Sequence, residues 1–226
     1  MQGRVWREAV GVLPHANIKA KTMIVPTYDS GLNKKLGGGL SGLVEIYGDE
    51  GTGKTGLALS LFQHQEGVFV DLDGTFPHHM VPVGSERNVS LFKPEKNILK
   101  SIIDVAGAVS RYGGIVVIDP VGVLTPTDIG KLVPELGCLG LADGALVVMI
   151  NHCDAYGKSK GERYTTLYTS QRIELRGGVP WKKRGEVIGM KSEYKVTKNN
   201  LEPPQCKGSL NILFERGGVD EVAETV

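Results

Sequence analysis

The chain has 226 residues, of which 41% are hydrophobic and 23% are charged, and its formal net charge is +1. This length suffices for one well-buried domain and is short for two. The near-neutral charge argues weakly against a dedicated nucleic-acid binder. Three widely spaced cysteines without a CxxC pair favour a reduced, cytoplasmic setting, and no apolar run approaches the roughly 18 residues that span a bilayer.

Residues 1–23 are predicted to form a short N-terminal segment ahead of a single core domain, residues 24–226. In that core, apolar runs bounded by turn residues predict strands at 42–48, 67–73, 114–119, 145–150, 172–176, 187–199 and 209–215. Helices are predicted between the early strands, at 53–65, 94–112 and roughly 128–143. This alternation predicts an α/β fold with a mainly parallel sheet covered on both faces, and the late strands without helices predict an antiparallel edge.

A phosphate-binding pattern follows the first of these strands. The sequence GDEGTGKT (48–55) fits G-x-x-x-x-G-K-[ST] between a predicted strand and a predicted helix. Gly51 and Gly53 allow the backbone to wrap closely around phosphates, Lys54 is expected to reach the β- and γ-phosphates, and the Thr55 hydroxyl to ligate Mg²⁺. The predicted nucleotide-binding residues of this loop are Gly48, Asp49, Glu50, Gly51, Thr52, Gly53, Lys54, Thr55 and Gly56.

Acidic residues end two other predicted strands. Asp119 ends IVVID, where ligands bind in open α/β sheets, and is expected to complete the Mg²⁺ site. Asp71 and Asp73 end VFVDLD, and one of them could orient an attacking water. The alternative is that both carboxylates only cap the turn DGTF.

A basic stretch begins directly after the buried run ALVVMI. From Gly157 to Arg184 there are eight basic and two acidic residues, so this stretch carries +6 and the remainder of the chain −5. Such a stretch can form a face that binds a polyanion, or simply a solvated charged surface.

Six ordered segments resemble the RecA/RadA recombinase family. They are SGLNKKLGGGLSGLVEIYGDEGTGKT, FVDLDGTF, VVIDPVGVLTP, VMINH, LYTSQRIELR and YKVTKNNLEPPQCKGSLNILFERGG. The resemblance covers nearly everything from Ile24 to the C-terminus. It implies a RecA-like P-loop ATPase core that uses ATP and Mg²⁺.

The resemblance also assigns roles to single residues. Asp73 falls where the family carries the glutamate that activates water, and His152 where a glutamine senses the γ-phosphate, so Lys54, Asp73 and His152 are the expected catalytic residues. Phe214 matches an aromatic residue that lies against adenine, with core packing as the alternative. Lys198 matches a lysine that reaches the γ-phosphate of a neighbouring subunit, with a solvated strand edge as the alternative.

The loop from about Cys153 to Thr166 corresponds to the second single-strand DNA-binding loop of the family. Because it begins beside His152, the nucleotide state can bias its order. Residues 161–163 are expected at a helix start, where N–H groups can meet DNA phosphates, and Tyr164 could stack on a base or pack inside the protein. The predicted DNA-binding residues are Lys158, Lys160, Gly161, Glu162, Arg163, Tyr164, Thr165 and Thr166.

The expected function is therefore an ATP-dependent, single-strand DNA-binding recombinase that forms homo-oligomeric filaments or a ring. Departures from the family pattern include Asp73 for glutamate, His152 for glutamine, and a shortened segment before ALVVMI.

One alternative function is that of a non-catalytic paralogue that regulates another recombinase, and another is that of a ring-forming helicase or KaiC-like protein. The reduced core suggests a virus- or phage-encoded enzyme, with residues 1–23 docking on a neighbour. A zinc site from His78, His79 and Cys153 is not expected, because the spacing matches no ligand pattern.

Overall fold

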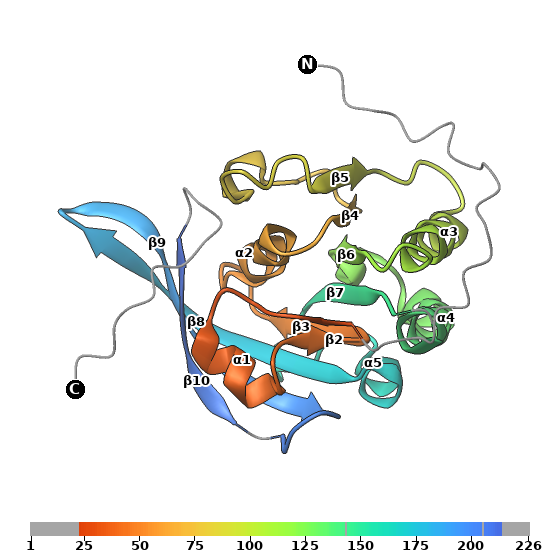
Figure 1. The fold of residues 1–226 in the computed structure, drawn as a ribbon. Coiled ribbons are helices and arrows are strands. Elements are labelled where there is room, and N and C mark those ends of the chain that lie inside the picture. The colour runs from red at the N-terminus through yellow and green to blue at the C-terminus, as the bar shows by residue number, and fades with distance from the viewer. Residues whose placement is uncertain (1–22, 143, 205, 214–226) are drawn as a thin grey trace.

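The computed structural model describes residues 23–142, 144–204 and 206–213 (Figure 1). Nearly all of the predicted N-terminal segment, together with Phe214, therefore lies outside the described residues. The helices are α1 (Ser30–Leu36), α2 (Lys54–Leu59), α3 (Ile98–Ser110), α4 (Pro126–Ala142) and α5 (Glu162–Tyr168), with short 3₁₀ helices η1 (Ser60–Gln63), η2 (His78–Met80) and η3 (Val121–Val123). The strands are β1 (Ile24–Val25), β2 (Leu40–Ser41), β3 (Leu43–Gly48), β4 (Gly67–Asp71), β5 (Val89–Phe92), β6 (Ile115–Asp119), β7 (Leu146–His152), β8 (Gln171–Lys183), β9 (Glu186–Asn199) and β10 (Lys207–Leu213).

The described strands form an eight-stranded sheet in the order β10-β9-β8-β3-β7-β6-β4-β5, beside a small β1-β2 pair. The six strands from β8 to β5 run parallel, whereas β9 and β10 are antiparallel. The predicted α/β fold with an antiparallel edge is confirmed. Edge strand β5 was not predicted, because its four residues alternate too briefly to be distinguished from a loop.

The two faces of the sheet are covered by different helices, as β7 illustrates. Leu146, Val148 and Ile150 join the buried cluster beneath α1 and α2, whereas Val147 and Met149 join the cluster beneath α3 and α4. Successive side chains of a strand point to opposite faces, so a central strand must be apolar on both. This explains the continuous hydrophobicity of the run.

The carboxyl ends of the parallel strands meet at one edge of the sheet. In register, Gly48 of β3 pairs with His152 of β7, and Asp71 of β4 pairs with Asp119 of β6. Four of the positions singled out from the sequence thus lie at this edge. Within the described ranges, no helix is long and apolar enough to cross a membrane.

Beyond this body, β8 and β9 extend as a two-stranded arm (Figure 1). The turn at the end of the arm contains Arg184 with a positive φ of 51° and Gly185 with a φ of 89°. Strand β8 runs to Lys183, well past the predicted end at 176.

Candidate functional site: a phosphate loop beside a basic loop

The glycines of the phosphate loop are required by packing as well as by backbone conformation. Gly53 precedes α2 with a φ of 83°, and a Cβ at this position would lie 2.1 Å from Ile212 Cδ1. A Cβ on Gly48 would lie 2.0 Å from the carbonyl oxygen of Leu175. The loop is thus pressed against β8 and β10, and only its tip (residues 49–51) is exposed.

Lys54 is buried at the mouth of this loop. Its Nζ donates hydrogen bonds to the carbonyl oxygens of Gly48 (2.9 Å) and Asp49 (2.5 Å). Burial lowers the pKa of Lys54, and the nearby carboxylate of Asp119 acts in the opposite direction. A buried cation that is bonded to two loop carbonyls can exchange these contacts for contacts to phosphate oxygens.

Strand β9 is joined to the phosphate loop by a hydrogen bond. The Ser192 hydroxyl donates to the carbonyl oxygen of Thr52 at 2.8 Å, and the Thr52 hydroxyl donates to the carbonyl oxygen of Asp49 at 2.8 Å. This contact could not be predicted from local sequence patterns, because 140 residues separate Ser192 from Thr52.

Thr55 and Asp119 meet as the metal-site prediction requires. The Thr55 hydroxyl donates to Asp119 Oδ2 at 2.7 Å. Burial raises the pKa of Asp119 to about 6, opposed by the bond from Thr55, and the neighbouring Asp73 raises it further. A hydroxyl and a carboxylate are hard oxygen donors of the kind that Mg²⁺ prefers, and a divalent cation would stabilise the ionised carboxylate here. The donor set therefore fits Mg²⁺.

Asp71 and Asp73 differ in exposure. Asp71 is buried, its Oδ1 accepts from the N–H groups of Gly74 (2.8 Å) and Thr75 (3.1 Å), and its Oδ2 lies 3.2 Å from Lys93 Nζ. Burial alone would raise the pKa of Asp71, but these bonds and the lysine hold it below its ordinary value. Asp73 is exposed, and its Oδ1 accepts from the Thr75 hydroxyl at 2.6 Å.

Both carboxylates thus cap the turn, as the alternative interpretation expected. Asp73 is still close enough to Asp119 to raise the pKa of that group. Of the two, the exposed Asp73 remains the candidate for orienting water.

His152 ends β7 beside the phosphate loop. Burial and the nearby Lys54 lower the pKa of its imidazole, which favours the neutral ring. Its Nδ1 is buried, and no described residue bonds to it. A Cβ on Gly122 would lie 3.1 Å from His152 Cδ2, so the ring packs directly on the turn that follows Asp119.

The predicted DNA loop, about residues 153–166, is called the basic loop below. Three of its basic side chains are exposed: Lys158, Lys160 and Arg163. Lys160 Nζ donates to the carbonyl oxygen of Gly122 at 2.7 Å, which ties the loop to the turn after Asp119. The Arg163 guanidinium lies 5.9 Å from the centre of the Tyr164 ring. This part of the predicted surface is therefore accessible to a polyanion.

Several neighbouring predictions need correction. Thr165 is 0% exposed, because the period of α5 turns it inward, and its assignment to DNA binding is wrong. Gly161 does cap the helix start as expected, but the Glu162 N–H donates to the carbonyl oxygen of Ser159 rather than pointing to solvent. The Tyr164 ring packs on Gly130 of α4, so the packing alternative describes it. Thr166 is exposed, and its hydroxyl accepts from Arg172.

The +6 stretch does not form one face. Arg172 is buried in an ion pair with Glu45, and Arg176 pairs with Glu174 at 2.6 Å. The tip of the β8–β9 arm carries a separate exposed group, Lys182, Lys183 and Arg184. The charge counted along the sequence is thus divided between the loop and the arm.

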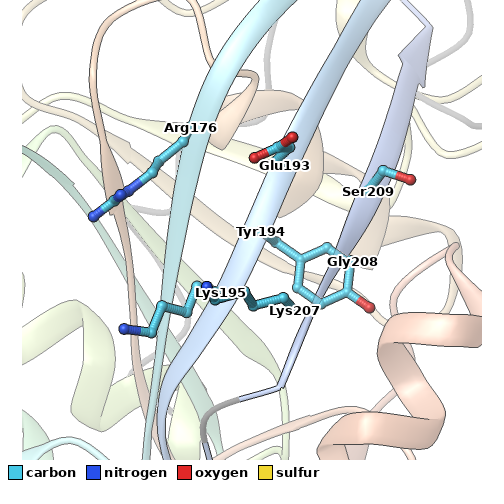
Figure 2. A pocket seen from close by; sticks show the side chains of 7 residues that line it. All are labelled: Arg176, Glu193, Tyr194, Lys195, Lys207, Gly208 and Ser209. Atoms are coloured by element: carbon cyan, nitrogen blue, oxygen red, sulfur yellow. The ribbon is translucent and has the colours of Figure 1, made fainter.

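The lysine-rich strand β9 also divides between two surroundings. Lys198 Nζ donates to the carbonyl oxygens of Thr166 (2.8 Å) and Leu167 (3.3 Å), and so caps the end of α5 in its own chain. Lys195 lines a groove of about 470 Å³ on the outer strands (Figure 2). The groove is lined by Arg176, Glu193, Tyr194, Lys195, Lys207, Gly208 and Ser209.

Curated relatives are similar in sequence along most of the chain, although no family model matches it. Protein RecA of Thermus thermophilus is 28% identical over 250 aligned residues, which cover 92% of this chain and 72% of that protein. Protein RecA of Methylococcus capsulatus is 32% identical over 235 residues, covering 86% and 66%. The chain belongs to the RecA family. Protein RecA of Azoarcus, 28% identical over 241 residues, agrees with this assignment.

Membership of the RecA family confirms the predicted family and fold, and it accounts for a P-loop followed by an acidic strand end. Among the residues that the structure describes, no group of three or more His, Cys, Asp or Glu side chains could hold a metal ion.

Proposed function

We propose that this RecA-family chain is an ATP-dependent, single-strand DNA-binding recombinase that assembles into homo-oligomeric filaments. We assign the ATPase core to residues 24–226 and a subunit-docking role to residues 1–23. The observation that carries the proposal is the pairing of Gly48 with His152. The phosphate loop begins at the first of these residues, and the basic loop begins directly after the second.

The chain's own groups suit phosphoryl transfer to water. Lys54 would exchange its carbonyl contacts for the β- and γ-phosphates, and Thr55 and Asp119 would hold Mg²⁺. When bound, the metal neutralises charge on the phosphate oxygens. Asp73 would orient the attacking water, and a ring N–H of His152 would donate to the γ-phosphate.

The basic loop would hold DNA through phosphates. Lys158, Lys160 and Arg163 are exposed cations on one short segment. Binding would therefore be steeply salt-dependent and largely indifferent to sequence. Lys198, now bonded to α5, would exchange these bonds for a neighbour's γ-phosphate upon assembly.

The test is ATP hydrolysis at low salt, with and without long single-stranded DNA. Lys54→Ala should abolish turnover, and Lys34→Ala, which removes an exposed lysine of α1, should leave it unchanged. Stimulation by DNA in the wild type and in Lys34→Ala, but not in Lys54→Ala, supports the proposal. Negligible turnover at saturating ATP and DNA contradicts it.

A second candidate, a regulator that binds ATP without hydrolysing it, is favoured by one observation. Asp73 Oδ1 accepts two hydrogen bonds from Thr75, one from its N–H (3.1 Å) and one from its hydroxyl (2.6 Å). The carboxylate is therefore used to stabilise the turn in which it lies. This candidate predicts Lys54-dependent ATP binding without DNA-stimulated turnover, and stimulation of another recombinase.

A further inference from the structure

A buried ion pair lies beneath the basic loop and outside the phosphate site. Arg172 Nε of β8 donates to Glu45 Oε2 of β3 at 2.6 Å, and the two side chains are 6% and 0% exposed. Burying two charges is costly unless their remaining hydrogen-bonding atoms are satisfied. The partners that satisfy them therefore indicate what the pair holds in place.

The other two nitrogens of Arg172 bond to the loop and to the helix that follows. Nη1 donates to the Thr166 hydroxyl at 2.9 Å, and Nη2 donates to the Ser159 hydroxyl at 3.1 Å. The guanidinium also lies 4.6 Å from the centre of the Tyr47 ring, next to Gly48. One planar fork thus connects the strand of the phosphate loop with both ends of residues 159–166.

Asn151 makes a second connection. Its Nδ2 donates to Glu45 Oε1 at 2.9 Å and to the carbonyl oxygen of Lys160 at 2.8 Å. Its Oδ1 accepts from the N–H of His152 at 2.9 Å. Asn151 is 0% exposed, so losing these bonds would leave a buried amide without partners, which is costly.

Within the part of the chain that the structure describes, residues 154–158 of the loop make no such connections. Asp154 Oδ1 accepts from the N–H groups of Tyr156 and Lys158, both at 2.9 Å, so these bonds close a turn on itself. Tyr156 at the tip is 89% exposed. The loop therefore has a self-contained tip and an anchored second half.

We propose that Arg172, Glu45 and Asn151 are positioning residues that hold residues 159–166 as a preformed platform. Nucleotide binding then changes the tip, residues 154–158, and leaves the platform in place. Lys160 and Arg163 are presented to DNA by this platform, a consequence that rests on the proposed function. The anchoring itself does not.

Hydrogen–deuterium exchange on the full chain, with and without Mg²⁺–ATP, measures the two halves separately. In the wild type, we expect amides of residues 160–165 to exchange slowly in both conditions, and amides of residues 155–158 to exchange quickly and to respond to nucleotide. Arg172→Lys keeps a cation opposite Glu45 but removes the fork. It should accelerate exchange at residues 160–165 by about tenfold or more, the effect of losing two hydrogen bonds.

Two variants separate positioning from general stability. Glu45→Gln/Arg172→Gln removes both buried charges, and should recover the stability that Arg172→Gln alone loses while residues 160–165 stay fast. Ser159→Ala removes one acceptor of the fork without touching the ion pair, and carries the test if Arg172→Lys does not fold. Ser110→Ala, which removes a hydroxyl bond within α3, is the matched control.

Equal exchange in the two halves of the wild-type loop, or unchanged exchange at residues 160–165 in both Arg172→Lys and Ser159→Ala, overturns the proposal. Single-strand DNA affinity of the same variants tests the consequence for function. Arg172→Lys should weaken DNA binding at least tenfold with ATP affinity unchanged. If the wild type binds no DNA, the proposed function fails, and the exchange result still decides the anchoring.

Discussion

Asp119→Asn should stabilise the nucleotide-free protein while impairing its metal site. The Asp119 carboxylate is placed beside Thr55 in surroundings that raise its pKa from the ordinary 3.8 to about 6, chiefly by burial. Asparagine keeps the shape and can still accept the bond from the Thr55 hydroxyl through its amide oxygen. It removes the buried charge.

The expected gain follows from the pKa. At about 1.4 kcal/mol for each pH unit, the rise from 3.8 to about 6 corresponds to roughly 3 kcal/mol. The folded state holds the proton up to about pH 6 and the unfolded state releases it near pH 3.8, so this group makes the wild type less stable as pH rises between those values. The variant does not lose stability in this way. The difference in free energy of unfolding between the variant and the wild type should reach its full size above about pH 7 and vanish below about pH 4.

Urea unfolding at a series of pH values, in EDTA and without nucleotide, measures the difference directly. Added Mg²⁺–ATP should then raise the stability of the wild type much more than that of the variant, because a ligand stabilises the state that binds it. An Asp119→Asn protein that is less stable than the wild type at pH 7.5, or a stability difference that does not vary with pH, would refute the reasoning.

Three further changes test the surroundings of the site. Gly53→Ala should lower ATP affinity at least tenfold in a titration, because its Cβ would strike Ile212. Gly113 also has a positive φ but has open space around it, so Gly113→Ala should lower stability alone. Ser192→Ala removes the bond that braces the phosphate loop and should lower the free energy of unfolding by about 1 kcal/mol and weaken ATP binding several-fold, as denaturation and titration would show. Asp73→Glu lengthens the carboxylate by one methylene and should raise single-turnover hydrolysis about tenfold at unchanged ATP affinity. An unchanged rate would remove Asp73 from the water-activating role.

Local patterns predicted the features that depend on local chemistry. The phosphate loop is a contiguous motif, and Asp119 ends a strand whose continuous hydrophobicity indicates that the strand is buried. The parallel order of strands then brings Asp119 to the edge where Gly48 lies. For these features, neighbours in sequence determine most of the environment.

Long-range side-chain pairing could not be predicted in the same way. Arg172 was counted as part of a surface charge, although the structure buries it against Glu45, 127 positions earlier. One signal was present: a glutamate in the middle of the apolar run GLVEIYG needs a partner, since an isolated buried charge is strongly disfavoured. Thr165 was misjudged for a related reason, because the bounds of α5 decide which side chains turn inward.

The strand order also determines where this protein can vary. Strands β7 and β8 are consecutive in the chain, but β3 lies between them in the sheet. Because all three strands are parallel, the connecting segment, residues 153–170, starts at the edge where the phosphate loop begins and passes over one face of β3 to the start of β8. Because that segment contributes no strand to the sheet, its tip can lengthen or change charge at little cost to folding, since loop closure depends only weakly on length. A change in what the protein binds would thus remain next to the nucleotide site, whatever sequence the tip acquires.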